Sequence, residues 1–322
     1  MSPTTAPARY AITIPFDGVT LAEHRDWFTR LADLGYSDVW SSEVDGVDGF
    51  TPLALAAASE ARLRVGVAVA PAFTRGPALL AMSVAALAEV AGDRFIMGLG
   101  ASSQPVVERW NAIPYDQPYA RTRDVLRFLR RALNNEKIDE TFETFAVHGF
   151  RLSRPVTVRP PVLLGALRPR MLRLAGDEAD GAILNWLAAG DVARCREEIG
   201  AASTVAARLF VIPTTDVEAA RAIGRRMISS YLTVGAYAEF HRWLGRGDTL
   251  QPVWDRWAAG DRAGATDAVP DELVDQLIIH GSFEACREHV ARYVAAGVDV
   301  PILAVIPVGV GLADAVTGLA PR

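Results

Sequence analysis

The chain has 322 residues, half of them hydrophobic, and a formal net charge of −5. This composition allows a large core, and no basic stretch with interleaved aromatic residues points to nucleic-acid binding. No apolar run approaches the roughly 18 residues that span a bilayer, so no membrane anchor is expected. Residues 1–9 lack the apolar core of a signal peptide and are predicted to form a disordered arm. Cys195 and Cys286 are too few for a disulfide framework, which favours a cytoplasmic location.

Arginine supplies almost all of the positive charge, and Lys137 is the only lysine. Its polar surroundings, "NNEKIDE", do not suit the buried amine of lowered pKa that Schiff-base chemistry needs. A phosphate-binding P-loop also requires a lysine directly after a glycine. The composition therefore argues against both kinds of chemistry.

Short apolar or β-branched runs alternate with amphipathic segments along the chain, which predicts alternating strands and helices. The expected strands are 10–16, 37–42, 62–71, 94–100, 161–167, 180–186, 207–213 and 300–307. The expected helices between them are 21–35, 51–61, 76–92, 120–135, 169–179, 191–202 and 282–297. Three insertions are expected: a loop at about 104–118, a segment with a hairpin at about 137–160, and a helical segment at about 214–275.

Eight strands that alternate with helices predict one α/β domain with a parallel sheet over residues 10–307, followed by a C-terminal tail over 308–322. The count of eight favours a closed (β/α)8 TIM barrel with inserted segments. An open, doubly wound sheet is the alternative that the pattern leaves open.

The stretch "DRFIMGLGASS" carries most of a G-x-G-x-x-G fingerprint, with Ser103 in the place of the third glycine. A dinucleotide fingerprint belongs on the first strand and is followed by an acidic residue about 20 positions later. Here the glycines follow the fourth expected strand and lead into a proline-containing loop. The dinucleotide interpretation is therefore disfavoured, and the motif instead lies at the strand end where a barrel has its active site.

The other expected strand ends are small and neutral, with few acids. Such a rim suits a planar, anionic, hydrogen-bonding ligand better than a metal ion, and no metal site is expected. Glu43 is the best acid at a strand end, either as a catalytic group or as a structural carboxylate. Gly165 and Ala166, followed by Arg168 at a helix start, are a candidate phosphate site. Asn185 and Trp186 either border a ligand or pack at the rim.

Longer stretches resemble a known family. "RVGVAVAPAFTRGPALLAMSVAALAEVAGDRFIMGLGASSQPVVERWN", with "FTPLALAAA", "LRPRMLRLAGDEADGAILNWL" and "HGSFEACREHVARYVAAGV", is similar to the bacterial-luciferase-like superfamily. Within it the chain resembles the coenzyme F420-dependent oxidoreductases of actinobacteria over residues 10 to about 307. The resemblance implies a luciferase-like TIM barrel, a homodimer, and F420, or alternatively FMN, at the C-terminal mouth of the barrel.

The resemblance also implies which residues hold the cofactor. A non-prolyl cis peptide would fall at Ala68–Val69, behind the ring, and the deazaflavin would lie beside Ala101, Ser102 and Ser103. The phosphate would be met by Gly165, Ala166 and Arg168. The tail would be bordered by Leu184, Asn185 and Trp186. Arg75 and Arg168 are candidates to meet a polyglutamate tail. Many relatives carry an acid–histidine pair after the second strand, but here the pair reads Glu43-Val44. A mechanism with that histidine as base is therefore not expected.

The activity implied is that of an F420-dependent oxidoreductase, which moves a hydride between carbon C5 of the deazaflavin and a small organic substrate. Two alternatives are an FMN-dependent monooxygenase fed by a separate reductase and a non-catalytic cofactor-binding protein. The expected partners are a small-molecule substrate and a separate reductase or F420-reducing dehydrogenase. The sequence does not identify the substrate.

Overall fold

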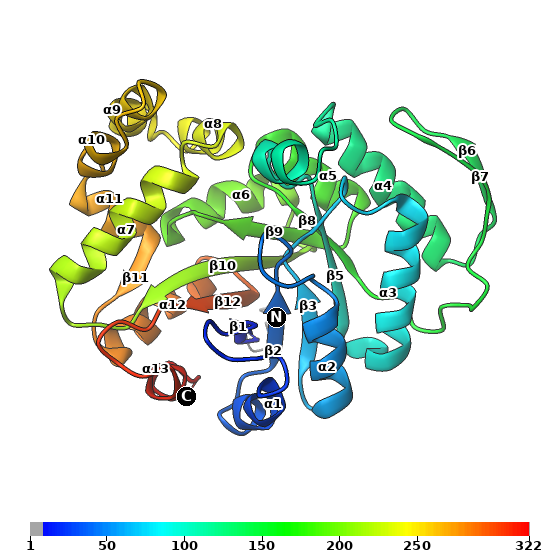
Figure 1. The fold of residues 1–322 in the computed structure, drawn as a ribbon, viewed down its shortest axis with the longest axis horizontal. Helices are drawn as coiled ribbons and strands as arrows, with labels where there is room; N and C mark the ends of the chain where they lie inside the picture. Colours follow the sequence, from blue (N-terminus) through cyan, green and yellow to red (C-terminus); the bar gives the residue numbers. More distant parts are fainter. Residues whose placement is uncertain (1–8, 322) are drawn as a thin grey trace, which may run out of the picture.

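The computed structural model describes residues 9–321 and contains a parallel barrel. Its eight strands form a closed ring, because β12 pairs with both β1 and β10. In ring order they are β1 (Ala11–Thr13), β2 (Asp38–Ser41), β3 (Arg64–Val67), β5 (Phe95–Gly100), β8 (Val162–Gly165), β9 (Gly181–Asn185), β10 (Thr204–Ile212) and β12 (Val300–Val305). Each overlaps a strand expected from the sequence, so the closed barrel is confirmed and the open sheet is wrong (Figure 1).

Helices follow the barrel strands and cover the outside of the ring (Figure 1). They are α1 (His24–Asp33), α2 (Thr51–Ser59), α3 (Pro77–Ala91), α4 (Pro118–Leu133), α5 (Pro169–Glu178), α6 (Val192–Ile199), α12 (Phe283–Ala295) and α13 (Leu312–Gly318). Four of them, α2 to α5, have proline in the first turn, where its missing N–H would have no partner in the helix anyway. Short helical turns lie at Gly92–Arg94, Pro105–Trp110 and Ala189–Asp191.

Alternation along the strands divides the core into two layers. One set of side chains fills the inside of the barrel and comprises Ala11, Trp40, Ile96, Leu163, Ile183, Ala206, Val300 and Ile302. The other set packs outward against the helices and includes Val39, Val65, Leu164 and Leu184. Gly66 makes room for the largest interior side chain, since a Cβ at this position would lie 2.5 Å from the Trp40 ring.

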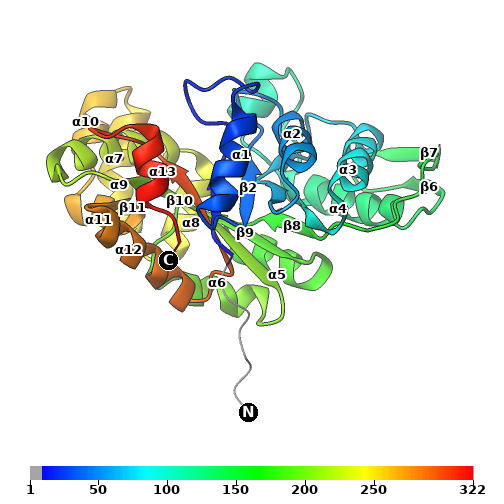
Figure 2. The same ribbon diagram turned by 90° about the horizontal axis from the view of Figure 1, so that it is seen from below.

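The insertions lie on opposite sides of the barrel (Figures 1 and 2). The antiparallel hairpin of β6 (Ile138–Thr141) and β7 (Ala146–Phe150) lies within the expected segment 137–160. The expected helical insertion contains α7 (Val217–Tyr231), α8 (Gly235–Trp243), α9 (Gly247–Ala258), α10 (Arg262–Asp267) and α11 (Asp271–Leu277). It is followed by a short strand that the sequence did not predict, β11 (Ile278–His280), which pairs with β10 outside the ring.

Both ends of the described chain belong to the barrel. Helix α13 lies in the expected tail 308–322 and packs beside α1, where Nη2 of Arg30 donates to Oγ1 of Thr317 at 3.0 Å (Figure 2). The hydroxyl of Tyr36, which follows α1, donates to the Val316 carbonyl at 2.8 Å. Val316 is fully buried in the main core, so the packed domain extends beyond residue 307. Most of the predicted N-terminal arm, residues 1–8, lies outside the described residues. Arg9 is held at the barrel, because its N–H donates to the Asp299 carbonyl at 3.1 Å.

Candidate functional site

The third barrel strand is interrupted at the mouth of the barrel. β3 ends at Val67, the Ala68–Val69 peptide is cis, as the resemblance implied, and the chain then pairs again with β5 through β4 (Ala70–Pro71). The Val69 side chain lies against two glycines. A Cβ on Gly100 would be 2.5 Å from Cγ2 of Val69, and a Cβ on Gly165 would be 3.2 Å from Cγ1. These glycines of β5 and β8 therefore provide the space that Val69 occupies.

Residues Ala101 to Ser103 continue from β5 and are all partly exposed. Ser102 has a positive φ of 62°, and its carbonyl accepts a hydrogen bond from the Tyr115 hydroxyl at 3.1 Å. The Ser103 carbonyl accepts from the N–H of Val107 at 3.0 Å. With Ala68 and Val69, this segment forms a surface of small side chains, which we call the platform (Ala68, Val69, Ala101, Ser102 and Ser103).

The candidate phosphate residues follow β8. Arg168 is exposed directly before α5, and no ion pair involving it occurs among residues 9–321. The Ala166 N–H is already used, because it donates to the Ile183 carbonyl at 3.1 Å as part of the sheet. Arg170 lies over the Tyr119 ring at 3.7 Å. The Arg168 side chain is thus available to an anion, whereas the Ala166 N–H is not, and the N–H groups of Met171 and Leu172 donate to the Arg168 carbonyl at 2.9 Å.

The expectations for Leu184 and Trp186 need correction. Leu184 is fully buried and points into the layer between barrel and helices, so its side chain cannot border a ligand at the mouth. The Trp186 ring is 1% exposed and packs on Phe210 with a centroid distance of 4.3 Å. The Trp186 carbonyl lies 2.9 Å from Nε2 of His241, whose pKa burial lowers to about 3. Both residues are parts of the core.

Asn185 lies between Leu184 and Trp186 in the chain and is partly exposed. Its side-chain oxygen accepts from the N–H of Trp186 at 3.0 Å, and its Nδ2 donates to the Tyr237 hydroxyl at 3.1 Å. Burial raises the pKa of Tyr237 to about 12, so this phenol keeps its proton at neutral pH. Asn185 therefore connects the end of β9 to helix α8 of the helical insertion.

Glu43 is paired with an arginine. Arg75 donates from Nη2 at 2.8 Å and from Nε at 3.1 and 3.2 Å to the Glu43 carboxylate, and the Gly49 N–H donates at 2.9 Å. Glu43 raises the pKa of Arg75 by accepting these hydrogen bonds. Asp48 lies 3.6 Å from the same guanidinium and accepts from the N–H groups of Phe50 and Thr51. The structural interpretation of Glu43 is favoured. Nε and Nη2 of Arg75 are engaged by these acids, and its role toward a polyglutamate tail stays a prediction.

One polar residue of the mouth was missed by the sequence analysis. Arg208 lies on β10 and lines a cavity of about 240 Å³ together with Thr13, Phe16 and Phe210. Its signal was present in the expected strand "ARLFVIP", where it is the only charged residue. A charge within an apolar barrel strand indicates a side chain that faces either the mouth or the lumen.

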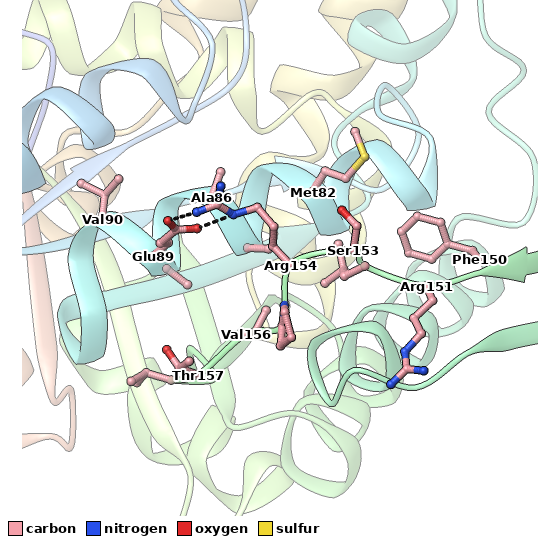
Figure 3. A pocket seen from close by; sticks show the side chains of 15 residues that line it. Met82, Ala86, Glu89, Val90, Phe150, Arg151, Ser153, Arg154, Val156 and Thr157 are labelled. Atoms are coloured by element: carbon pink, nitrogen blue, oxygen red, sulfur yellow. Dashed lines mark hydrogen bonds and ion pairs between the residues drawn. The ribbon is translucent and has the colours of Figure 1, made fainter.

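A larger hollow, of about 850 Å³, lies outside the barrel between α3 and residues 150–158 (Figure 3). None of the site residues predicted from the sequence lines this hollow. Within residues 9–321 no group of three or more His, Cys, Asp or Glu side chains could hold a metal ion. Over the same residues, every helix is too short or too polar to cross a membrane.

Comparison with known proteins agrees with this geometry. The family described as luciferase-like monooxygenase matches residues 3–300. The chain belongs to this family. One relative is a Mycobacterium tuberculosis protein provisionally named as a coenzyme F420-dependent oxidoreductase. The two sequences are 29% identical over 315 residues, and the alignment covers 87% of this chain and 90% of the relative.

Solved structures of luciferase-like proteins share the fold. The coenzyme F420-dependent tetrahydromethanopterin reductase from Methanopyrus kandleri superposes with a TM-score of 0.78 at 18% identity and covers 98% of both chains. An F420-dependent secondary alcohol dehydrogenase, solved with an F420–acetone adduct, gives a TM-score of 0.77 at 12% identity and covers 97% of both chains. The luciferase-like barrel expected from the sequence is thus confirmed.

Proposed function

We propose that this protein is an F420-dependent oxidoreductase that acts on a small organic substrate. The proposal rests on the platform, where Val69 packs on Gly100 and Gly165 and leaves small, partly exposed residues at the mouth. A flat surface without large side chains fits the face of a planar ring. The printed names of one relative and of two proteins that share the fold include coenzyme F420, which favours the deazaflavin over FMN.

The residues present also fit the acidic part of such a cofactor. Arg168 stands exposed at the start of the ten-residue helix α5, where the positive end of the helix dipole favours an anion. An arginine there binds phosphate through two N–H groups. When bound, F420 would supply the hydride-carrying carbon. The chain would contribute mainly binding, orientation and exclusion of water.

A fluorescence titration with F420 and FMN side by side tests this proposal. We expect F420 to bind about 10-fold more tightly than FMN, and Arg168→Gln to weaken F420 binding by about 10-fold. Arg173→Gln is the matched control, because Arg173 lies on the same helix, is exposed and pairs with Glu198 at 2.6 Å. Tight binding of FMN without binding of F420 would contradict the proposal and favour the monooxygenase. Binding without turnover over a broad substrate panel would favour a cofactor-binding protein.

We also propose that the protein is a homodimer that uses the outer face of α3. Leu79, Met82 and Val90 lie along this face and are 50%, 50% and 49% exposed. Figure 3 shows Met82, Ala86 and Val90 on α3 beside the segment 150–157, where Arg154 pairs with Glu89. Several large apolar side chains exposed on one face are typical of a protein interface.

A double substitution on α3 tests the dimer. We expect the native chain of 34.7 kDa to elute as a dimer in size-exclusion chromatography with light scattering. Leu79→Asp with Met82→Asp should give the mass of one chain, because two charges would be buried without partners. Val217→Asp is the control, since Val217 is 40% exposed at the first position of α7. A native monomer, or a dimer that persists in the double variant, would refute this interface.

We also propose that the protein is located in the cytoplasm and works with a separate reductase. The cytoplasmic location is supported by Cys195 and Cys286, which are both free and buried. A separate F420-reducing dehydrogenase would keep the cofactor reduced if the reaction runs toward substrate reduction.

A further inference from the structure

The cavity beside Arg208 lies at the mouth of the barrel, between the ends of β1, β10 and β12. Most of its lining is apolar and includes Phe16, Phe210, Ala304 and Ile306. Arg208 and Thr13 are the polar side chains that the barrel strands contribute to it, and the exposed carboxylate of Asp17 lines it from the loop after β1. A small pocket with an apolar wall and a few polar groups is typical of a ligand site.

Arg208 has no protein partner for its charge. Its Nε is buried without a hydrogen-bond acceptor. Within residues 9–321 no ion pair involves its guanidinium, and this group lies 5.1 Å from the centre of the Phe210 ring. Burial lowers the pKa of Arg208, and the phenols of Tyr231 and Tyr237 act in the opposite direction, with no carboxylate among these groups. Arg208 as a whole is partly exposed where it lines the cavity, and a largely desolvated cation without a counterion favours the binding of an anion there.

The position of this cavity in the ring is informative. β10 stands four places from β3 in the ring of eight strands, so Arg208 and Val69 come from opposite sides of the barrel. The platform is built from β3 and β5 and their extensions, whereas the cavity belongs to β10, β12 and β1. A molecule held in the cavity would therefore face the platform across the mouth.

We propose that this cavity holds one end of the substrate and that Arg208 binds a carboxylate there, so that the substrate is a small carboxylic acid. The inference rests on the proposed function and names its substrate class. Arg208 is the one cation among the residues that line the cavity, and the exposed carboxylate of Asp17 lines it as well. One positive charge with a carboxylate nearby balances a monoanionic carboxylate better than a doubly charged phosphate. The hydroxyl of Thr13, which is also buried without a partner, is available to donate a further hydrogen bond.

Fluorine NMR with 4-fluorobenzoate and its neutral counterpart 4-fluorobenzamide tests this site. We expect Arg208→Gln to weaken binding of 4-fluorobenzoate by at least about 10-fold and to change binding of the amide by less than about 2-fold. Arg194→Gln is the control, because Arg194 is exposed on α6 and stacks on Trp243. It should leave the binding of both probes unchanged. Equal binding of 4-fluorobenzoate to the native and Arg208→Gln proteins would overturn the inference.

Three further measurements separate this inference from its alternatives. Inorganic phosphate should not displace 4-fluorobenzoate at equal concentration, and displacement would assign the site to a phosphate. F420 should bind Arg208→Gln as tightly as the native protein, since a loss would assign Arg208 to the cofactor and overturn the inference. If the native protein binds 4-fluorobenzoate through Arg208 but does not bind F420, the proposed function fails while the carboxylate site stands.

Thermal unfolding distinguishes a ligand-binding role from a structural one. Arg208→Met should unfold at the same temperature as the native protein or higher, because it removes a partly buried charge that has no counterion and keeps an unbranched apolar stem against the same neighbours. A Tm lower by more than about 5 °C would identify Arg208 as a structural residue and would count against the inference.

Discussion

Gly98→Ala is expected to destabilise the barrel more than any other substitution considered for the cofactor side of the mouth. A Cβ on Gly98 would lie 2.0 Å from the Val67 carbonyl oxygen and 2.5 Å from Cδ1 of Ile183. The first neighbour is the backbone of the adjacent strand, which cannot rotate away as a side chain does. We therefore expect a loss of about 3 kcal/mol in the free energy of unfolding, at the upper end of the range for overpacking.

Thermal or denaturant unfolding of the variant measures this loss, which should lower the Tm by at least about 5 °C. Gly190→Ala is the matched control, because nothing lies within 4 Å of its Cβ position and its φ is not in the left-handed region. Its free energy of unfolding should change by less than about 0.5 kcal/mol. A Gly98→Ala protein as stable as the control would show that β3 and β5 can move apart at the mouth.

The second large effect is expected at the pair Glu43–Arg75. These side chains are only 16% and 18% exposed, and Arg75→Met would leave the Glu43 carboxylate with the Gly49 N–H as its remaining donor. We expect a loss of about 2 kcal/mol in the free energy of unfolding, less than for a fully buried pair. Combining Arg75→Met with Glu43→Gln should restore part of this stability, because the unpaired charge is then gone.

A double-mutant cycle on Glu43→Gln and Arg75→Met measures how far the two residues depend on each other. A coupling of about 1–2 kcal/mol is expected if Glu43 serves to hold the loop after β2. A coupling below about 0.5 kcal/mol, together with a loss of turnover in Glu43→Gln alone, would instead return Glu43 to the role of a catalytic acid.

The barrel could be predicted because each of its strands is a short apolar run bounded by turn residues. The element beyond residue 307 was missed because α13 has only seven residues and resembles a tail in sequence. β11 was missed because its three residues directly follow a helix. In both cases the structure depends on contacts with distant segments, α1 and β10, which no local pattern reveals.

The candidate site was predicted less completely than the fold. The resemblance correctly indicated the cis peptide at Ala68–Val69, but the function of the residues around it stays a prediction. Alternation places Leu184 and its neighbour Ile183 on opposite faces of the strand, but only the structure shows that Ile183 is the one inside the barrel. The pairing of Glu43 with Arg75 joins residues on different loops and could not be read from spacing.

The position of β12 between β1 and β10 also affects how the chain is made. The ring closes only after Val300–Val305 has left the ribosome, and until then both neighbouring strands present unpaired edges. Translation of the intervening residues 213–299, at about 5–20 residues per second, keeps the nascent barrel open for several seconds or longer. The helical insertion thus lengthens the interval in which the growing polypeptide is most prone to aggregate and most in need of a chaperone.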